Sequence, residues 1–204
     1  MAIAVDDIIT KVSILLNDTA YTRWSAAELI YWLNAGEVQI IREDPPANAT
    51  HGAVLLVAGT KQTIPAGSIV LIDIYRNMGT TGTTAGPAIT MTFKGDIDRF
   101  NPGWHEDDSS VVVKNFMYDM NNPKTYWVYP KSPGTNYVDM VRSTVPTAAV
   151  SGGNINLDDD YESALIDYIL FRAYQKDAEH GMQDKRVLGH WQSFLAHFGK
   201  EVPA

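Results

Sequence analysis

The sequence contains no cysteine, which excludes disulfide bonds and thiolate zinc sites, so the fold must rest on packing. It also lacks a long apolar run: the longest, at 53–58, falls far short of the roughly 18 residues that a membrane-spanning helix needs. No basic residue precedes Asp6 and Asp7, whereas a secretory signal begins with positive charge. We therefore expect an intracellular chain that makes no contact with a membrane.

Basic residues are too few to balance the acidic ones. The chain has 16 Lys and Arg against 24 Asp and Glu, a formal net charge of -8. Nonspecific binding to nucleic acid depends on Lys and Arg that neutralise phosphates, and the densest basic cluster is the pair Lys185-Arg186. The charge argues against an ordinary DNA-binding surface and leaves only a local basic face open; the average surface should repel nucleic acid.

Motifs of common enzyme classes are absent as well. The sequence has no Gly-x-Gly-x-x-Gly or Walker loop and no Gly-x-Ser-x-Gly nucleophile elbow. Gly79-Thr-Thr-Gly82 follows an expected strand but leads into no helix, so it makes no phosphate-binding loop. His190 and His197 lie about two helical turns apart, too far to share one zinc ion without a third ligand. We predict no catalytic, cofactor-binding or metal-binding residues.

Acidic runs are the remaining places where chemistry could occur. Glu106-Asp107-Asp108 could bind calcium or supply paired carboxylates for glycoside hydrolysis. The run lacks the spaced ligands of an EF-hand, so a solvated loop is the favoured interpretation. A second run, 158–160, is explained by capping of a helix N-terminus.

The strongest local pattern that is present covers 24–46 and predicts a helix. Ser25 and Glu28 form a capping box, and Trp24 with Leu29 can close a hydrophobic staple. Two prolines after Asp44 end the helix. Its buried stripe comprises Leu29, Ile30, Leu33, Ile40 and Ile41.

Three further helices are predicted, so that two lie before and two lie after a β-rich middle. One covers 5–16, one starts with Asp158 or Asp159 as its cap, and the last ends at Gly199. Their expected buried positions are Ile8, Val12, Leu15 and Leu16 in the first; Ala164, Leu165, Tyr168, Ile169 and Arg172 in the third; and Val187, Leu188, Trp191, Phe194, Leu195 and Phe198 in the last. Because no amphipathic helix can hide its stripe alone, we expect them to form one four-helix body.

The middle of the chain changes to strand patterns. We expect a hairpin of 53–57 and 61–64 with Gly59 at positive φ, and then a central strand at 68–76. Further strands are expected at 89–94, 110–118, 125–129 and 137–143, with one helical turn at 96–100. The fold class is thus α+β: a helical domain of 1–46 and 154–204 with a sandwich or barrel-like insertion at 47–153, in which 148–153 is a linker.

Two parts of the insertion are candidate contacts for a partner. The loop 78–87 has too little apolar surface to order itself, so it is either a mobile tip or a segment that a partner orders. Trp104 fits either the core or an interface. The candidate contact residues in the loop are Met78, Gly79, Thr80, Thr81, Gly82, Thr83 and Thr84.

Several fragments, in this order and spacing, together resemble a known family. They are Arg23-Trp24-Ser25-Ala-Ala-Glu28-Leu29 with Trp32-Leu33-Asn34-Ala-Gly36-Glu37; Ala58-Gly59-Thr60-Lys-Gln62-Thr-Ile64-Pro65; Tyr75-Arg76-Asn77; Asn101-Pro102-Gly-Trp104-His105; Tyr126-Trp-Val-Tyr129-Pro130; and Tyr161-Glu162-Ser-Ala164-Leu-Ile-Asp167-Tyr168 through Ala173-Tyr-Gln-Lys176-Asp177-Ala178-Glu179. The chain resembles the head-tail adaptor, or connector, proteins of tailed bacteriophages, particularly the short-tailed type.

The resemblance implies a structural virion protein at the head-tail junction, assembled in the cytoplasm of the host bacterium. It implies a homo-oligomeric ring, twelve-fold if it follows the portal protein, that joins the portal to the tail nozzle or tail tube. DNA passes through such a ring without specific binding, and an acidic channel would repel its phosphates. Lys200, Glu201 and Val202 are further candidate contacts, because some relatives grip the portal with C-terminal extensions. Those extensions are longer than the tail after Gly199 here, and this departure from the family counts against a docking role for 200–204.

Two alternatives remain open. A tail-completion or minor tail protein would have the same fold but would bind a different component of the virion. A virion-associated cell-wall hydrolase would have to use Glu106, Asp107 or Asp108. For the adaptor, we expect the helical body to meet the portal and the β-rich insertion to meet the tail.

Overall fold

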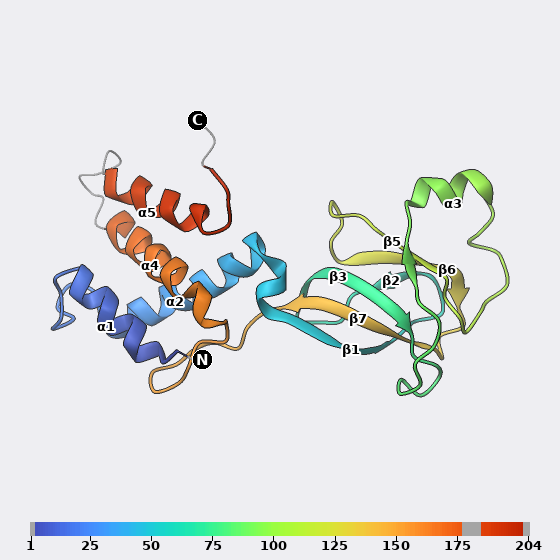
Figure 1. Cartoon of the computed structure of the whole chain (residues 1–204), viewed down its shortest axis with the longest axis horizontal. Helices are drawn as coiled ribbons and strands as arrows, with labels where there is room; N and C mark the ends of the chain where they lie inside the picture. The colour runs from blue at the N-terminus through green and yellow to red at the C-terminus, as the bar shows by residue number, and fades with distance from the viewer. Residues whose placement is uncertain (1–2, 177–184, 202–204) are drawn as a thin grey trace. The chain divides into compact units, whose positions relative to one another are not determined.

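The computed structural model describes residues 3–176 and 185–201 and combines helices with two β-sheets (Figure 1). The chain forms two compact units. Met1–Asn48 and Pro146–Ala204 make the helical unit, and Ala49–Val145 make the β unit. The mixed α+β class expected from the sequence is confirmed.

The helical unit contains four α-helices within the described residues. They are α1 (Val5–Leu15), α2 (Ala26–Glu43), α4 (Glu162–Lys176) and α5 (Lys185–Ala196), with the short 3-10 helices η1 (Pro45–Asn48) after α2 and η2 (Asp159–Tyr161) before α4. Helix α4 packs against α1, α2 and α5, and α1 also contacts α2. Buried residues at helical spacing include Ile8, Val12, Leu29, Leu33, Ile40, Ile41, Leu165, Ile169 and Phe194.

Only half of the predicted capping box at α2 forms. The Ser25 hydroxyl accepts the backbone N–H of Glu28 at 3.3 Å, as expected. The Glu28 carboxylate turns instead to Lys176 of α4, whose Nζ donates at 2.7 and 2.9 Å. The sequence shows that Glu28 can close the box, but it cannot show that a lysine 148 residues away competes for the carboxylate.

For two residues of the predicted apolar stripes, the prediction that they are buried is wrong. Leu15 in α1 is 52% exposed and Leu188 in α5 is 55% exposed. Ile9 and Ser13 of α1 are buried instead. The stripe of each helix is therefore narrower or rotated relative to the expected one, because its position depends on where the neighbouring helices lie.

The chain returns to α2 after the β unit, and two residues of α2 form hydrogen bonds with the returning segment. Asn34 Oδ1 accepts the N–H of Ala149 at 2.7 Å, and its Nδ2 donates to the carbonyl of Ala149 at 3.0 Å. Glu37, fully buried, accepts the N–H of Asn156 at 2.9 Å. A Cβ on Gly36 would lie 3.0 Å from the Tyr168 ring, so glycine lets α4 approach α2 closely. Segment 146–157 is thus a packed part of the helical unit.

The β unit consists of two sheets. Strand β7 (Tyr137–Thr144) lies between β1 (Ala49–Leu55) and β3 (Ser68–Asn77), all antiparallel. The second sheet has the order β2 (Gly59–Thr63), β6 (Thr125–Ser132), β5 (Asn115–Tyr118) and β4 (Thr90–Met91), with β4 parallel to β5. Helix α3 (Lys94–Phe100) follows β4 and confirms the helical turn expected there.

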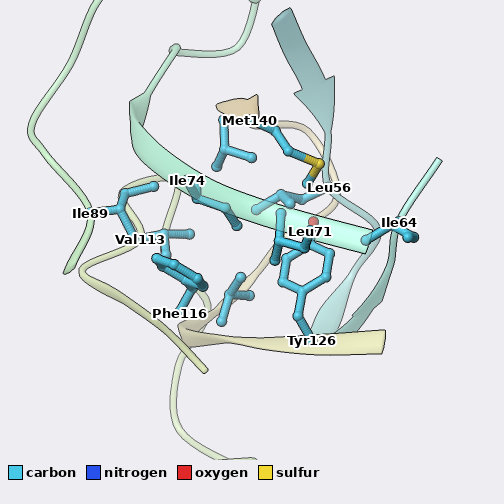
Figure 2. Packing of buried hydrophobic residues seen from close by; sticks show 11 residues of the cluster. Leu56, Ile64, Leu71, Ile74, Ile89, Val113, Phe116, Tyr126 and Met140 are labelled. Atoms are coloured by element: carbon cyan, nitrogen blue, oxygen red, sulfur yellow. The ribbon is translucent and has the colours of Figure 1, made fainter. Parts of the chain in front are cut away.

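Both sheets contribute to one apolar core (Figure 2). Leu71, Ile74 and Met140 come from the first sheet, and Phe116 and Tyr126 come from the second. Leu56, Ile64, Ile89 and Val113 fill the core from segments that connect the strands. Since residues alternate along a strand, the neighbours of Phe116 in β5 and of Tyr126 in β6 point to the outer face of the second sheet.

The predicted hairpin around Gly59 is wrong. Gly59 does have positive φ, at 111°, but β1 pairs with β7 and β2 pairs with β6 in the other sheet. Buried Leu56 turns into the core between them, and its N–H bonds to the carbonyl of Asn136. The glycine therefore lets the chain cross from one sheet to the other, which local sequence cannot distinguish from a hairpin.

Two more strand predictions need correction. Strand β3 is not central but lies at an end of its sheet. The alternating segment 89–94 contains only two strand residues, and of its three apolar side chains Ile89 is buried whereas Met91 and Phe93 are exposed. The chain enters α3 at Lys94, so the alternation of buried and exposed side chains that a longer strand would show does not develop. The strands expected near 110–118, 125–129 and 137–143 exist, although β5 is shorter and β6 longer than expected.

Candidate interaction surfaces

Asn77 anchors the predicted contact loop at its base. This buried side chain donates to the carbonyls of Pro87 at 3.0 Å and Val113 at 2.8 Å, and it accepts the N–H of Val113 at 2.8 Å. Its backbone also bonds to Pro87 and Gly86 on the far arm of the loop. One residue thereby closes the loop 78–87 and fastens it to the chain before β5.

The loop is then ordered further by β7. Backbone bonds of 2.8 Å join Met78 N–H to Tyr137 O and Tyr137 N–H to Gly79 O. Gly82 lies against the Tyr137 ring, which a Cβ there would approach to 3.1 Å. The expectation that the loop cannot order itself is therefore wrong at its base. Of the candidate contact residues in the loop, Thr80, Thr81, Thr83 and Thr84 are exposed, and their role as a partner contact stays a prediction.

Trp104, the other candidate in the insertion, is fully buried at 0% exposure. Its Nε1 donates to Asp98 at 2.8 Å, and its ring stacks on His105 at 3.8 Å between centroids. The side chain is thus not available to a partner and instead holds the segment after α3. Bonds from Lys94 and from this indole lower the pKa of Asp98.

The neighbouring acidic run is also structural. His105 Nδ1 lies 2.8 Å from the Thr60 hydroxyl, and Asp107 accepts Asn101 Nδ2 at 2.6 Å. The carbonyl of Glu106 accepts Lys131 Nζ. These contacts fix a loop, as the favoured interpretation expected.

The C-terminal candidates divide into three cases. Gly199 has φ of 64° and closes α5, with Lys200 N–H bonded to Leu195 O. Lys200 Nζ binds Glu43 Oε2 at 2.7 Å, so its charge is engaged within the chain. Glu201 is exposed, and Val202 lies outside the described residues.

An acidic cavity of about 410 Å³ lies beside that ion pair, within the helical unit. Its lining includes Glu43, Asp44, Asp160 and Tyr161. The Tyr161 hydroxyl donates to Asp44 Oδ2 at 2.5 Å; burial and this bond raise the pKa of Tyr161 to about 12.

Charge is divided unequally between the units. The sequence of the helical unit holds 8 basic and 16 acidic residues, whereas the β unit holds 8 of each. The formal charge of -8 therefore belongs to the helical unit, and the β unit is neutral.

The β unit carries an apolar groove of about 540 Å³ on the outer face of the second sheet. Met117 and Trp127, which alternate with the core residues Phe116 and Tyr126, line its floor. Its walls include Met91, Phe93 and Met120, which are 55%, 78% and 68% exposed. Exposed apolar surface of this kind typically marks a binding site.

A family model described as SU10 adaptor protein matches residues 3–202 of the chain. The chain belongs to the SU10 adaptor protein family. Members are structural adaptor proteins of bacteriophage virions and are not known as enzymes. The resemblance to phage adaptors is confirmed in this broad form, while the short-tailed type stays a prediction. No curated protein matches the chain.

His190 and His197 of the adaptor share a carboxylate partner, which their spacing in the sequence could not reveal. Asp167 of α4 lies between them, with Oδ1 3.0 Å from His190 Nδ1 and Oδ2 3.2 Å from His197 Nε2. These contacts join α4 to α5 and to the turn that follows it. Among the described residues, no cluster of His, Asp and Glu has the arrangement of a metal site. Over the same residues, no helix combines the length and the apolar character that crossing a membrane requires.

Sequence reasoning missed the roles of Asn34, Glu37 and Asn77 in the adaptor, although all three lie in fragments that carry the resemblance. One signal was present: Glu37 falls on the apolar stripe between Leu33 and Ile41, where a carboxylate needs a partner. No local pattern identifies what that partner is, because Asn156 lies 119 residues away.

Proposed function

We propose that this adaptor forms a ring at the head-tail junction of the virion, between the portal and the tail nozzle or tail tube. Membership of the adaptor family carries this proposal. The ring has twelve copies if it follows the symmetry of the portal. Each copy then offers two different faces to its neighbours, as closed rings require.

The uneven distribution of charge supports different roles for the two units. An acidic surface repels the phosphates of DNA, so a channel lined by it lets the polymer slide without sticking. Because the formal charge of -8 belongs to the helical unit, we assign the channel lining to that unit. The exposed run Asp158-Asp159-Asp160 is its densest part.

We further propose that the helical unit meets the portal and the β unit meets the tail. The threonine residues of the loop 78–87 are exposed while its base is fixed by Asn77 and Tyr137. A preformed loop with exposed hydroxyl groups loses little conformational entropy when it binds, which favours a contact role.

The decisive experiment measures the mass of the adaptor alone and mixed with portal rings of the same phage, by native mass spectrometry or mass photometry. The proposal expects portal complexes that carry many copies, even if the protein alone is monomeric. A protein that ignores assembled portal but binds tail assemblies would instead be a tail-completion or minor tail protein.

A further inference from the structure

The two outer faces of the β unit lie on opposite sides of one core. Val54 packs against the core, so Leu55 and His51 of β1 point away from it. The Tyr75 ring meets His51 edge-on at 5.6 Å between centroids, which places Tyr75 on the same face. We call Leu55, Tyr75 and the adjacent Ala53 the outer patch; Leu55 and Tyr75 are each 49% exposed.

We infer that the apolar groove of one copy receives the outer patch of the next copy in the ring. The groove belongs to the outer face of the second sheet and the outer patch to that of the first. A contact that joins opposite faces runs head to tail, and such contacts form a ring when the rotation from one copy to the next closes on itself. This inference rests on the proposed ring.

The area of the groove suits a subunit contact. Met91, Phe93 and Met120 together expose on the order of 400 Å² if each side chain counts about 200 Å². That is about half of the roughly 800 Å² that each partner contributes to a standard interface. Three methionines around the groove, including Met117, can adapt to the shape of the incoming side chains.

Charge also favours a second copy as the occupant. The helical units carry the whole formal charge and repel one another, whereas the neutral β units can meet without that cost. One ion pair beside each face is already formed within the chain. Lys94 pairs with Asp98 at 2.7 Å beside the groove, and Asp139 pairs with Arg76 at 3.0 Å on the face of the outer patch.

The absence of native cysteine permits a direct test by disulfide cross-linking on portal-bound adaptor. The double variant Leu55→Cys/Met120→Cys should give a ladder of covalent multimers on a non-reducing gel. Neither single variant should cross-link with itself, and a mixture of the two should stop at dimers, because each copy then offers one thiol. Cross-linking of Leu55→Cys alone would show a symmetric contact and overturn the inference.

A binding assay gives an independent readout. Phe93→Glu and Leu55→Glu should each lower the number of copies on the portal ring several-fold. The matched control Phe100→Glu, at a residue of α3 that is 85% exposed and does not line the groove, should bind as the unmodified protein does. Full rings with Phe93→Glu and no cross-linked ladder would overturn the inference and leave the ring function standing. If the unmodified protein ignores portal, the proposed function fails, and cross-linking of the concentrated free protein decides the contact separately.

Discussion

Asn34 forms with Ala149 the two hydrogen bonds that a paired strand would form, at 2.7 and 3.0 Å. The contact joins residues 115 apart in the chain and fastens the segment that returns from the β unit. It explains why an asparagine stands in the middle of a helix that otherwise reads as amphipathic.

Asn34→Ala should therefore destabilise the helical unit. Ala149 is buried, so both of its backbone groups would lose their partner, at a cost of about 2–4 kcal/mol. Asn34→Asp keeps the acceptor and loses the donor, so its loss should be intermediate. Urea unfolding measures both, with the exposed Asn122→Ala as control. Equal stability of Asn34→Ala and the control would contradict this role.

Glu37 should make stability depend on pH. Burial raises the pKa of its carboxyl above the ordinary value of 4.5, and Oε2 finds no partner among the described residues. The folded state thus prefers the protonated form. The protonated Glu37 carboxyl therefore contributes fully to the stability of the fold below pH 4.5, and this contribution is lost as the pH rises through the raised pKa.

Glu37→Gln tests this assignment, because glutamine keeps the acceptor for Asn156 N–H and cannot ionise. The free energy of unfolding is measured between pH 4 and 8 for both proteins. The difference between them should shift in favour of the variant as the pH rises. Parallel curves would show that Glu37 does not titrate in this range.

Gly36→Ala should destabilise the adaptor despite the better helix propensity of alanine. The new Cβ would lie 3.0 Å from Tyr168 and 3.1 Å from Leu165, which forces α2 and α4 apart at a cost of about 1–3 kcal/mol. Gly189→Ala in α5 meets nothing within 4 Å and should stabilise by about 0.5–1 kcal/mol. Thermal unfolding of the two variants separates the effect of packing from that of helix propensity. Melting temperatures that shift in the same direction would refute the close approach of α2 and α4.

These contacts show where sequence reasoning succeeds and fails. The N-cap of α2 at Ser25 and the left-handed Gly199 in the turn that follows α5 result from local chemistry and were predictable. The partner of β1 was not, because Gly59 permits a crossing between sheets as readily as a hairpin. The sequence likewise could not distinguish a core role from an interface role for Trp104, whereas the structure shows its indole N–H donating to Asp98.

The threonine loop should contribute to binding and not to stability. Replacing Thr80, Thr81, Thr83 and Thr84 by alanine removes exposed hydroxyl groups, so unfolding should change by less than about 0.5 kcal/mol. Attachment of tails to filled heads, counted by electron microscopy, should fall. Asn77→Ala is the complementary variant: it should destabilise the β unit, since it removes three hydrogen bonds, two of them buried. Normal tail attachment by the threonine variant would exclude the loop as the contact.

Charge reversal at Asp158 and Asp160 should slow the passage of DNA if the helical unit lines the channel. Lysine at these exposed positions attracts phosphates where the native carboxylates repel them, and repetition around a ring multiplies the effect. The rate of DNA ejection from variant phage, followed by a DNA-binding dye, should fall, and it should recover at high salt because salt screens exposed charges. Asp96→Lys/Asp108→Lys makes the same change in charge on the β unit and should leave ejection unchanged. An equal effect of the two variants would mean that the acidic surface of the helical unit does not face the DNA.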